Sequence, residues 1–406
     1  MRELSLPKIK KIKIDDSKLE KISLILIFLS MILIGSDRIS LSIYGFTVRF
    51  VQVILVLESL ILIIQGKYKI VLSIPIVSVI VSHLISTIFS YDLKESIAYN
   101  FWLIYNFIFV LYVFYSYAKN NSKEKVINLL LLSFLIQSIY IYIQFTMGLF
   151  GFDDPFFPMQ NYFNIYRPAI WFYEPSYLAT YFSAYLAISF YLLTSLKKKK
   201  YIYHTINSIL SIVVITSSTG YLAIGFSIML ISIINIRNIM KINKKVLVYI
   251  LLTIITLGVL LYILDLNFIN VFLGRIFTSG ISQASGGRVQ SWKETFDVFL
   301  NNPFIGIGPN AYPVYSNTGL PPYNVSLELL ANVGMVGFIA FYSFFINIIF
   351  TCYKSGKEKN NHFNISIVMG LIVFIVTLQA NQNYMRLYLW MLLGIALGFS
   401  RNNKKY

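Results

Sequence analysis

Long apolar stretches recur along this chain almost from its first residues to its last, and they limit its fold more than any other feature. Of its 406 residues, 57% are hydrophobic and only 13% are charged. A soluble domain cannot be so apolar, whereas a bundle of lipid-embedded helices can. Most stretches reach the roughly 20 residues that a helix needs to cross a bilayer. We therefore predict an all-α polytopic membrane helix bundle of about 12 transmembrane helices, with residues 1–406 forming a single integral membrane domain.

Short polar segments separate most of these spans. We place the spans at residues 19–35, 46–64, 70–90, 96–118, 126–149, 173–196, 201–218, 219–236, 246–264, 327–352, 363–380 and 385–400. The seventh and eighth spans form one apolar stretch that is interrupted only at residues 216–220. We predict a hairpin there, because lysine clusters flank the stretch on both sides and favour the same face of the membrane.

Alternate segments between the spans divide the positive charges unequally. Of the 34 lysines and arginines, 26 lie in one set of segments, and 23 of these 26 are lysine. That set consists of the N-terminus, 65–69, 119–125, 197–204, 237–245, 353–362 and the C-terminus. The pattern marks this set as cytoplasmic, including a basic tail over residues 1–18. The net charge of +17 thus reflects anchors beside membrane lipids, and we expect no nucleic-acid partner.

The opposite set of segments has few cations, and most of them are arginine. They are Arg38, Arg49, Arg167, Arg275, Arg288 and Arg386. This bias is unexpected in a chain that otherwise uses lysine. Because the planar guanidinium group suits bidentate phosphate binding, the bias predicts an outward-facing site for a phosphate-bearing substrate.

Two segments on this outer side are long, namely the loop 150–172 and the loop 265–326. Loops of such length are uncommon unless they bind something, so we expect the protein to work on this face. The chain has one cysteine, Cys352, and three histidines, none of which can join another on the outer side. We therefore expect no metal site and no cofactor.

The first candidate segment, Arg167–Ala179, joins the shorter outer loop to a span. Pro175 suits the first turn of a helix, which would place Glu174 at the helix start near the outer surface. Arg167 lies seven residues earlier, close enough to share a pocket with Glu174. Both a site role and a purely structural capping role fit this segment.

The second candidate segment contains an amphipathic helix that begins near Arg288 and carries Trp292. Its apolar side chains recur at helical spacing, at Val289, Trp292, Phe296 and Phe299. Such a helix can lie in the outer interface with Trp292 at headgroup level. A stretch rich in glycine and proline follows at 303–312 and includes Asn310.

The third candidate segment begins at Tyr323 and leads into a span. Asn324 is a plausible helix cap, and Glu328 would fall about one turn inside the helix, where a carboxylate needs a partner. Gly334 and Gly337 favour close helix packing.

These segments, in this order around one long outer loop, resemble the O-antigen polymerase and ligase (Wzy-like) superfamily of bacterial membrane proteins. The resemblance rests on Phe172–Ser176, on Gly287-Arg288 with Trp292 and Asn302–Gly308, and on Tyr323-Asn324, Glu328, Gly334 and Gly337. It covers about residues 165–345; the remaining spans are similar only in number and hydropathy.

The resemblance implies a metal-independent glycosyltransferase on the outer face of the cytoplasmic membrane. Its donor would be an undecaprenyl-diphosphate-linked oligosaccharide, and its acceptor a hydroxyl group. Arg288 matches the family's arginine before the Trp-bearing helix, so it is the first candidate for stabilising the leaving phosphate. The expected substrate-binding residues are Arg167, Arg275, Arg288, Arg386, Trp292, Asn310, Tyr323 and Asn324.

A carboxylate must be the general base, because no histidine lies outside. Glu174 is the first choice, with Glu328 and Asp297 behind it. The alternative for Glu174 is a structural pairing with Arg167 that shapes the pocket.

A polymerase of lipid-linked repeat units, for an O-antigen, capsule or exopolysaccharide, is the leading interpretation. Ligases often carry histidine where this chain has Tyr323, and tyrosine is a poor base at neutral pH. The alternatives are a ligase of finished glycan, a flippase for lipid-linked oligosaccharides, and a structural partner of a chain-length regulator. Such a regulator is also an expected partner of the polymerase.

Overall fold

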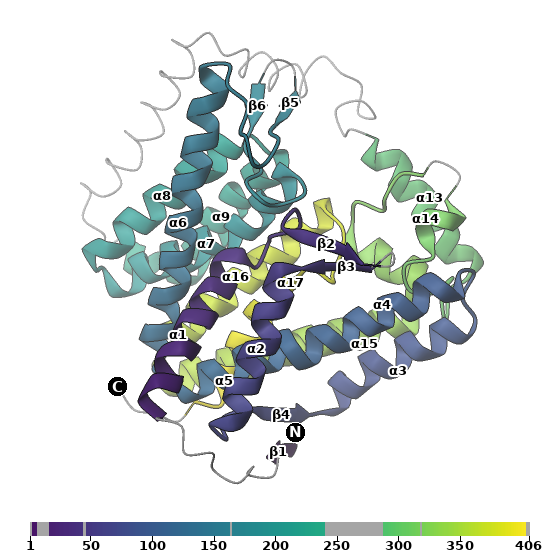
Figure 1. Ribbon diagram of the computed structural model, residues 1–406, viewed down its shortest axis with the longest axis horizontal. Helices are drawn as coiled ribbons and strands as arrows, with labels where there is room; N and C mark the ends of the chain where they lie inside the picture. Colours follow the sequence, from purple (N-terminus) through teal and green to yellow (C-terminus); the bar gives the residue numbers. More distant parts are fainter. Residues whose placement is uncertain are drawn as a thin grey trace.

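The structure is a computed structural model that describes residues 2–5, 16–43, 46–162, 165–239, 287–316 and 319–402. Its main elements are helices, arranged as Figure 1 shows. They are α1 (Asp16–Leu33), α2 (Phe50–Ile64), α3 (Ile74–Ile88), α4 (Leu93–Tyr105), α5 (Tyr112–Asn120), α6 (Lys123–Leu149), α7 (Pro175–Leu196), α8 (Lys199–Ile215), α9 (Ser218–Ile239), α13 (Arg288–Asn301), α15 (Val325–Glu358), α16 (His362–Thr377) and α17 (Leu387–Ser400).

Shorter elements connect these helices. A π-helix, η1 (Asn106–Leu111), joins α4 to α5, while α14 (Tyr312–Tyr315) and the 3-10 helix η2 (Leu378–Ala380) lie in loops. Three antiparallel two-stranded ribbons complete the described part: β1 (Arg2–Ser5) with β4 (Lys69–Leu72), β2 (Ser40–Ile43) with β3 (Phe46–Arg49), and β5 (Gln160–Tyr162) with β6 (Ile165–Arg167).

The predicted all-α membrane architecture is confirmed. Within the described residues, six helical segments are long and apolar enough to cross a bilayer: 93–120, 123–149, 175–196, 218–235, 325–358 and 362–380. The helices α2, α3 and α17 are apolar but shorter. A helix coincides with every predicted span except 246–264, which lies outside the described residues.

Two predicted spans begin too early. Residues 46–49 were expected to be helical but form β3, because Phe46 and its neighbours pair with Ser40–Ile43 in a tight ribbon. Residues 70–72 likewise belong to β4, and α3 starts only at Ile74, where Pro75 occupies its first turn. Strand pairing thus replaces the first turn of both predicted helices: β3 pairs with the adjacent β2, and β4 pairs with the distant β1.

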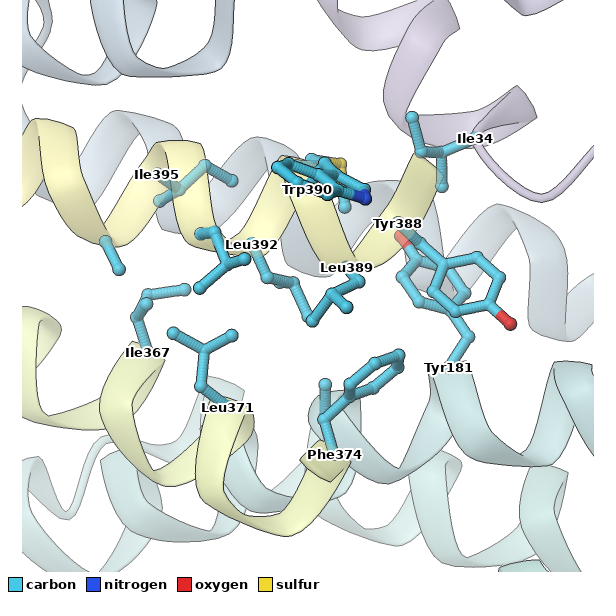
Figure 2. Close-up of a cluster of buried hydrophobic side chains, with 14 of the residues drawn as sticks. Ile34, Tyr181, Ile367, Leu371, Phe374, Tyr388, Leu389, Trp390, Leu392 and Ile395 are labelled. Carbon is cyan, nitrogen blue, oxygen red and sulfur yellow. The ribbon is translucent and has the colours of Figure 1, made fainter. Parts of the chain in front are cut away.

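The core is built around α7 and α17, whose side chains are almost all buried. The helix α7 packs against α8, α9 and α16, and α17 packs against α5, η1 and α15. Figure 2 shows Leu389 and Leu392 of α17 facing Leu371 and Phe374 of α16, with Tyr388 beside Tyr181 of α7. The helices α7 and α16 therefore hold the start of α17 in a fixed position.

Loops from distant parts of the chain contact one another at one end of the bundle. There, Arg38 Nη1 donates to the carbonyl of Pro158 at 2.6 Å, and the amide of Tyr91 donates to the carbonyl of Ile307 at 2.8 Å. We call this the loop-rich end; described residues of both predicted long loops, Pro158 and Ile307 among them, lie there with α13 (Figure 1). At the other, lysine-rich end, Asn402 Nδ2 donates to the carbonyl of Ala118 at 2.9 Å.

The helix α15 is kinked at Gly334, where the backbone turns to φ 65° and ψ −171°. At the kink, backbone amide and carbonyl groups of α15 form hydrogen bonds with the segment after α13. The amide of Met335 donates to the carbonyl of Pro303 at 2.8 Å, and the amide of Ile307 donates to the carbonyl of Ala331 at 3.0 Å. A Cβ atom on Gly334 would lie 2.3 Å from the carbonyl carbon of Phe304. The glycine-rich segment therefore docks onto α15. Gly306 is explained by its close approach to Asn332 of α15, and Gly308 by its close approach to Ser90.

Replacing Gly334 with alanine is expected to destabilise the protein. The backbone conformation at this position is essentially restricted to glycine, and strain of this kind costs about 1–3 kcal/mol, with a similar cost for the steric overlap. We expect a clear fall in the unfolding temperature of the detergent-purified protein. Gly225 is the matched control, because a Cβ atom there meets nothing within 4 Å; equal loss in both variants would contradict this account of the kink.

Candidate active site at the loop-rich end

A buried carboxylate, Asp37, holds two arginines from distant parts of the chain. Arg49 Nε lies 3.0 Å from Asp37 Oδ1, and Arg386 Nη1 lies 2.5 Å from Asp37 Oδ2. The side chains of Asp37 and Arg386 are each only 10% exposed. Asp37 follows α1, Arg49 ends β3 and Arg386 caps α17, so packing of α1 and α17 into one bundle brings the three together.

Arg386 also stacks on an aromatic ring. Its guanidinium carbon lies 3.8 Å from the centroid of the Tyr177 ring, and Gln382 Nε2 donates to the Tyr177 hydroxyl at 3.0 Å. Burial lowers the pKa of Arg386, but the Asp37 carboxylate together with Tyr388 and Tyr177 outweighs burial and raises the pKa above its usual value. Burial lowers the pKa of Arg49, and the same carboxylate offsets this only in part. Both arginines therefore depend on Asp37 to keep their charge compensated in this partly dehydrated position.

Glu174 lies where the sequence predicts it, at the N-cap of α7 with Pro175 in the first turn. The hydroxyl of Ser176 donates to Glu174 Oε2 at 3.0 Å, and the glutamate is half-buried. Tyr177, which stacks on Arg386, follows one turn along the same helix, and its backbone amide donates to the carbonyl of Glu174 at 3.1 Å. Glu174 thus borders the same site as Arg386.

Arg288 and Trp292 approach this site from α13. The Arg288 guanidinium carbon lies 5.8 Å from the centroid of the Tyr323 ring, and Trp292 Nε1 donates to the backbone carbonyl of Tyr323 at 3.3 Å. Burial raises the pKa of the Tyr323 hydroxyl; the Glu174 carboxylate raises it further, and Arg288 opposes them. Tyr323 is therefore protonated at neutral pH, and it is close enough to both Glu174 and Arg288 for their charges to act on it.

Glu328 occupies the first turn of α15, as predicted, and is 7% exposed. The backbone amide of Asn383 donates to its Oε2 at 2.6 Å, and the hydroxyl of Tyr99 donates to its Oε1 at 3.4 Å. Behind it, the hydroxyl of Tyr384 lies 2.7 Å from Nε2 of His83. This polar cluster links α3, α4 and α15 to the loop that carries Arg386.

The other predicted site residues are more scattered. Arg167 ends the β5–β6 ribbon opposite Gln160. Asn310 Nδ2 donates to Glu95 Oε2 at 3.2 Å. Asn324 caps α15 by accepting from the amide of Leu327, and its Nδ2 donates to the carbonyl of Gln379 at 3.0 Å. Arg275 lies outside the described residues, and the substrate contacts predicted for all four stay predictions.

No local sequence pattern marks Asp37, Arg49 or Tyr177 individually as a site residue. Arg49 belonged to the outward arginines, which was the available signal. Asp37 and Arg386 are 349 residues apart in the chain, so only folding reveals their contact. Within the described residues, no three His, Cys, Asp or Glu side chains gather so that they could hold a metal ion.

Comparison with known proteins supports the resemblance. Residues 203–342 match the Wzy_C family model, described as O-Antigen ligase. The match covers roughly a third of the chain and includes Arg288, Trp292, Tyr323 and Glu328. None of the curated proteins compared with this chain matches it. The family match indicates a glycosyl-transferring function of the O-antigen ligase and polymerase type.

Proposed function

Because the chain carries the O-antigen ligase family segment over residues 203–342, we propose that it polymerises lipid-linked polysaccharide repeat units. The donor is a glycan on an undecaprenyl-diphosphate carrier, and the acceptor is a sugar hydroxyl of another lipid-linked unit. The polymer belongs to an O-antigen, a capsule or an exopolysaccharide. A chain-length regulator is the expected protein partner.

One observation carries the proposal: arginines and carboxylates from four separate segments converge at one end of a membrane bundle. Arg386 stacks on Tyr177, while the charges of Glu174 and Arg288 both act on Tyr323. A transfer from a glycosyl diphosphate needs both kinds of group, since cations stabilise the departing diphosphate and a carboxylate activates the acceptor.

The reaction proposed at this site is a single displacement at the anomeric carbon. The acceptor oxygen forms a bond to that carbon as the bond from the carbon to the diphosphate oxygen breaks. The acceptor proton passes to a carboxylate, for which Glu174 is the first candidate, and the electron pair leaves with the diphosphate. Arg288 and Arg386 stabilise that charge, each charge-assisted hydrogen bond contributing about 1.5–3 kcal/mol.

We place the site on the outer face of the bacterial cytoplasmic membrane. The support is the charge pattern: the lysine-rich end carries the cytoplasmic signal, so the loop-rich end faces outward. The lipid-linked units that the enzyme uses would be presented at that surface.

A ligase that moves finished glycan to a lipid or protein acceptor is the second candidate, because the description of the matching family favours it. The raised pKa of Tyr323 weighs against it, since a protonated tyrosine cannot replace the histidine of many ligases as a base.

Arg288→Ala tests the proposal. We expect the rate of polymer formation to fall about 10- to 150-fold, because one charge-assisted contact with the diphosphate is lost. Lipid-linked glycans extracted from cells that lack the chromosomal gene and carry each variant would be sized on a gel. Single repeat units should accumulate with Arg288→Ala.

The matched control is Lys293→Ala, which removes an exposed cation from the same helix and should leave the polymer unchanged. Long chains that remain on the carrier would instead identify the protein as a ligase. Normal polymer with Arg288→Ala would contradict the assigned role of this arginine.

A further inference from the structure

A cavity of about 860 Å³ lies beside Arg386, on the side away from α7 and α13. It is bounded by the β2–β3 ribbon, the start of α2, the outer half of α4 and the start of α17. Almost all of its lining lies outside the family-matched residues, Asn310 being the exception among the described residues. The cavity therefore needs an explanation beyond the family match.

The inner wall of this cavity is polar and cationic. Arg49, Arg386 and Asp37 line it together, with Asn106 and Asn383 nearby. Asn106 begins the π-helix η1, and its Nδ2 donates to the carbonyl of Met385 at 2.9 Å. A π-helix inside a longer helix often marks a functional site, and this one turns an amide toward the cavity.

The outer wall consists of α4 side chains, which are charged at the start of the helix, at Lys94 and Glu95, and apolar beyond it. Ile97 is 56% exposed and Phe101 is 58% exposed, with Trp102 beside them. They belong to the segment 93–120, which is long and apolar enough to cross a bilayer. In a membrane, this side of the cavity faces lipid as far as the described residues show. The hydroxyl of Tyr105 donates to the carbonyl of Gln52 at 2.6 Å, which joins α4 to α2 toward the membrane interior.

A cavity with arginines on one wall and lipid-facing aromatic side chains on the other fits an amphiphile with a phosphate head and an apolar tail. We propose that this cavity admits a polyprenyl diphosphate from the membrane. Arg49 exchanges its contact with Asp37 for a contact with the diphosphate, and Phe101 and Trp102 contact the first prenyl units. The inference rests on the proposed function for the identity of the lipid, and it adds the access route and two positions, Asp37 and Arg49.

Asp37 makes this exchange feasible. It pairs with both arginines, which compensates the charges of two guanidinium groups that lie largely away from water. When a diphosphate arrives, it supplies more negative charge than one carboxylate, so Arg49 can turn to it while Asp37 keeps Arg386. Arg49 is the more exposed of the two, at 28% of its side chain.

Two binding experiments test the inference without any turnover. In the first, a photoreactive amino acid replaces Phe101, and the protein in nanodiscs is irradiated with undecaprenyl diphosphate. We expect this residue to form a cross-link with the lipid. Unlabelled undecaprenyl diphosphate that is present during irradiation should prevent the cross-link, whereas phosphatidylglycerol should not. Ile85 on α3 is the matched control, since it is apolar and 40% exposed but does not line the cavity. Equal cross-linking at both positions, or equal competition by phosphatidylglycerol, overturns the proposal.

In the second experiment, Arg49→Gln is compared with wild type for undecaprenyl diphosphate binding by native mass spectrometry. We expect binding to weaken about tenfold or more, and Lys293→Gln to bind normally. Inorganic diphosphate should compete far less well than the lipid, and equal competition overturns the role of the apolar wall. Unchanged affinity with Arg49→Gln overturns the role of Arg49. Normal lipid binding by a protein that forms no polymer would leave this inference standing and contradict only the proposed reaction.

Discussion

Replacing Arg386 with glutamine is expected to reduce polymer formation by more than a hundredfold. Arg386 is buried, pairs with Asp37 and stacks on Tyr177. Its loss removes a cation from the reacting diphosphate and leaves the Asp37 carboxylate without its closest partner. Breaking a buried pair in this way costs about 3–5 kcal/mol. Polymer yield per folded protein, from gels and from fluorescence-detected size exclusion, measures the effect.

A double variant separates the structural from the catalytic part of that loss. Combining Arg386→Gln with Asp37→Asn removes the unpaired carboxylate, so the unfolding temperature should recover much of its wild-type value. Polymer formation should stay low, because the cation is still missing. Recovery of both stability and polymer in the double variant would show that Arg386 serves only the fold.

Glu174→Gln is expected to slow polymerisation about 10²- to 10⁴-fold, the usual contribution of a general base. Glu174 is half-buried at the rim of the site, and its hydrogen bond comes from the rotatable hydroxyl of Ser176. An acceptor hydroxyl can therefore reach it. Lipid-linked units should accumulate while binding of undecaprenyl diphosphate stays normal, which distinguishes lost chemistry from lost substrate.

Glu328 and Asp297 provide the comparison for this assignment. Glu328 is buried and accepts from the backbone amide of Asn383, three residues before Arg386, so it positions the loop that carries this arginine. We expect Glu328→Gln to have a smaller effect on rate than Glu174→Gln. Asp297 is exposed on α13, and Asp297→Asn should behave as wild type. A larger loss of polymerisation rate with Glu328→Gln than with Glu174→Gln would identify Glu328 as the general base instead.

Local features of the chain were predictable because neighbouring residues determine them. Pro175 at the start of α7, Asn324 as the cap of α15 and the turn between α8 and α9 all follow from backbone rules that act within one or two helical turns. The spans follow from hydropathy for the same reason. The two early helix starts, at residues 46 and 70, were wrong because ribbon pairing competes with helix formation there.

Gly306, Gly308 and Gly334 show where rules that act between neighbouring residues no longer predict the structure. The sequence predicts close helix packing at Gly334, yet the structure uses Gly334 to kink α15 and dock residues 303–308 onto it. Such a contact needs two segments that are distant in sequence to meet backbone to backbone. The spacing of residues within either segment does not predict this contact.

The sequence by itself determined that this chain is a membrane helix bundle, and its charge pattern predicts which loops share a face. These properties depend on hydropathy and charge, which add up residue by residue. Only the tertiary structure decided that Asp37 meets Arg49 and Arg386, that Tyr323 lies near Glu174 and Arg288, and that a cavity opens beside α4. Those contacts depend on how α7, α15 and α17 pack, because packing sets distances between side chains that lie hundreds of residues apart.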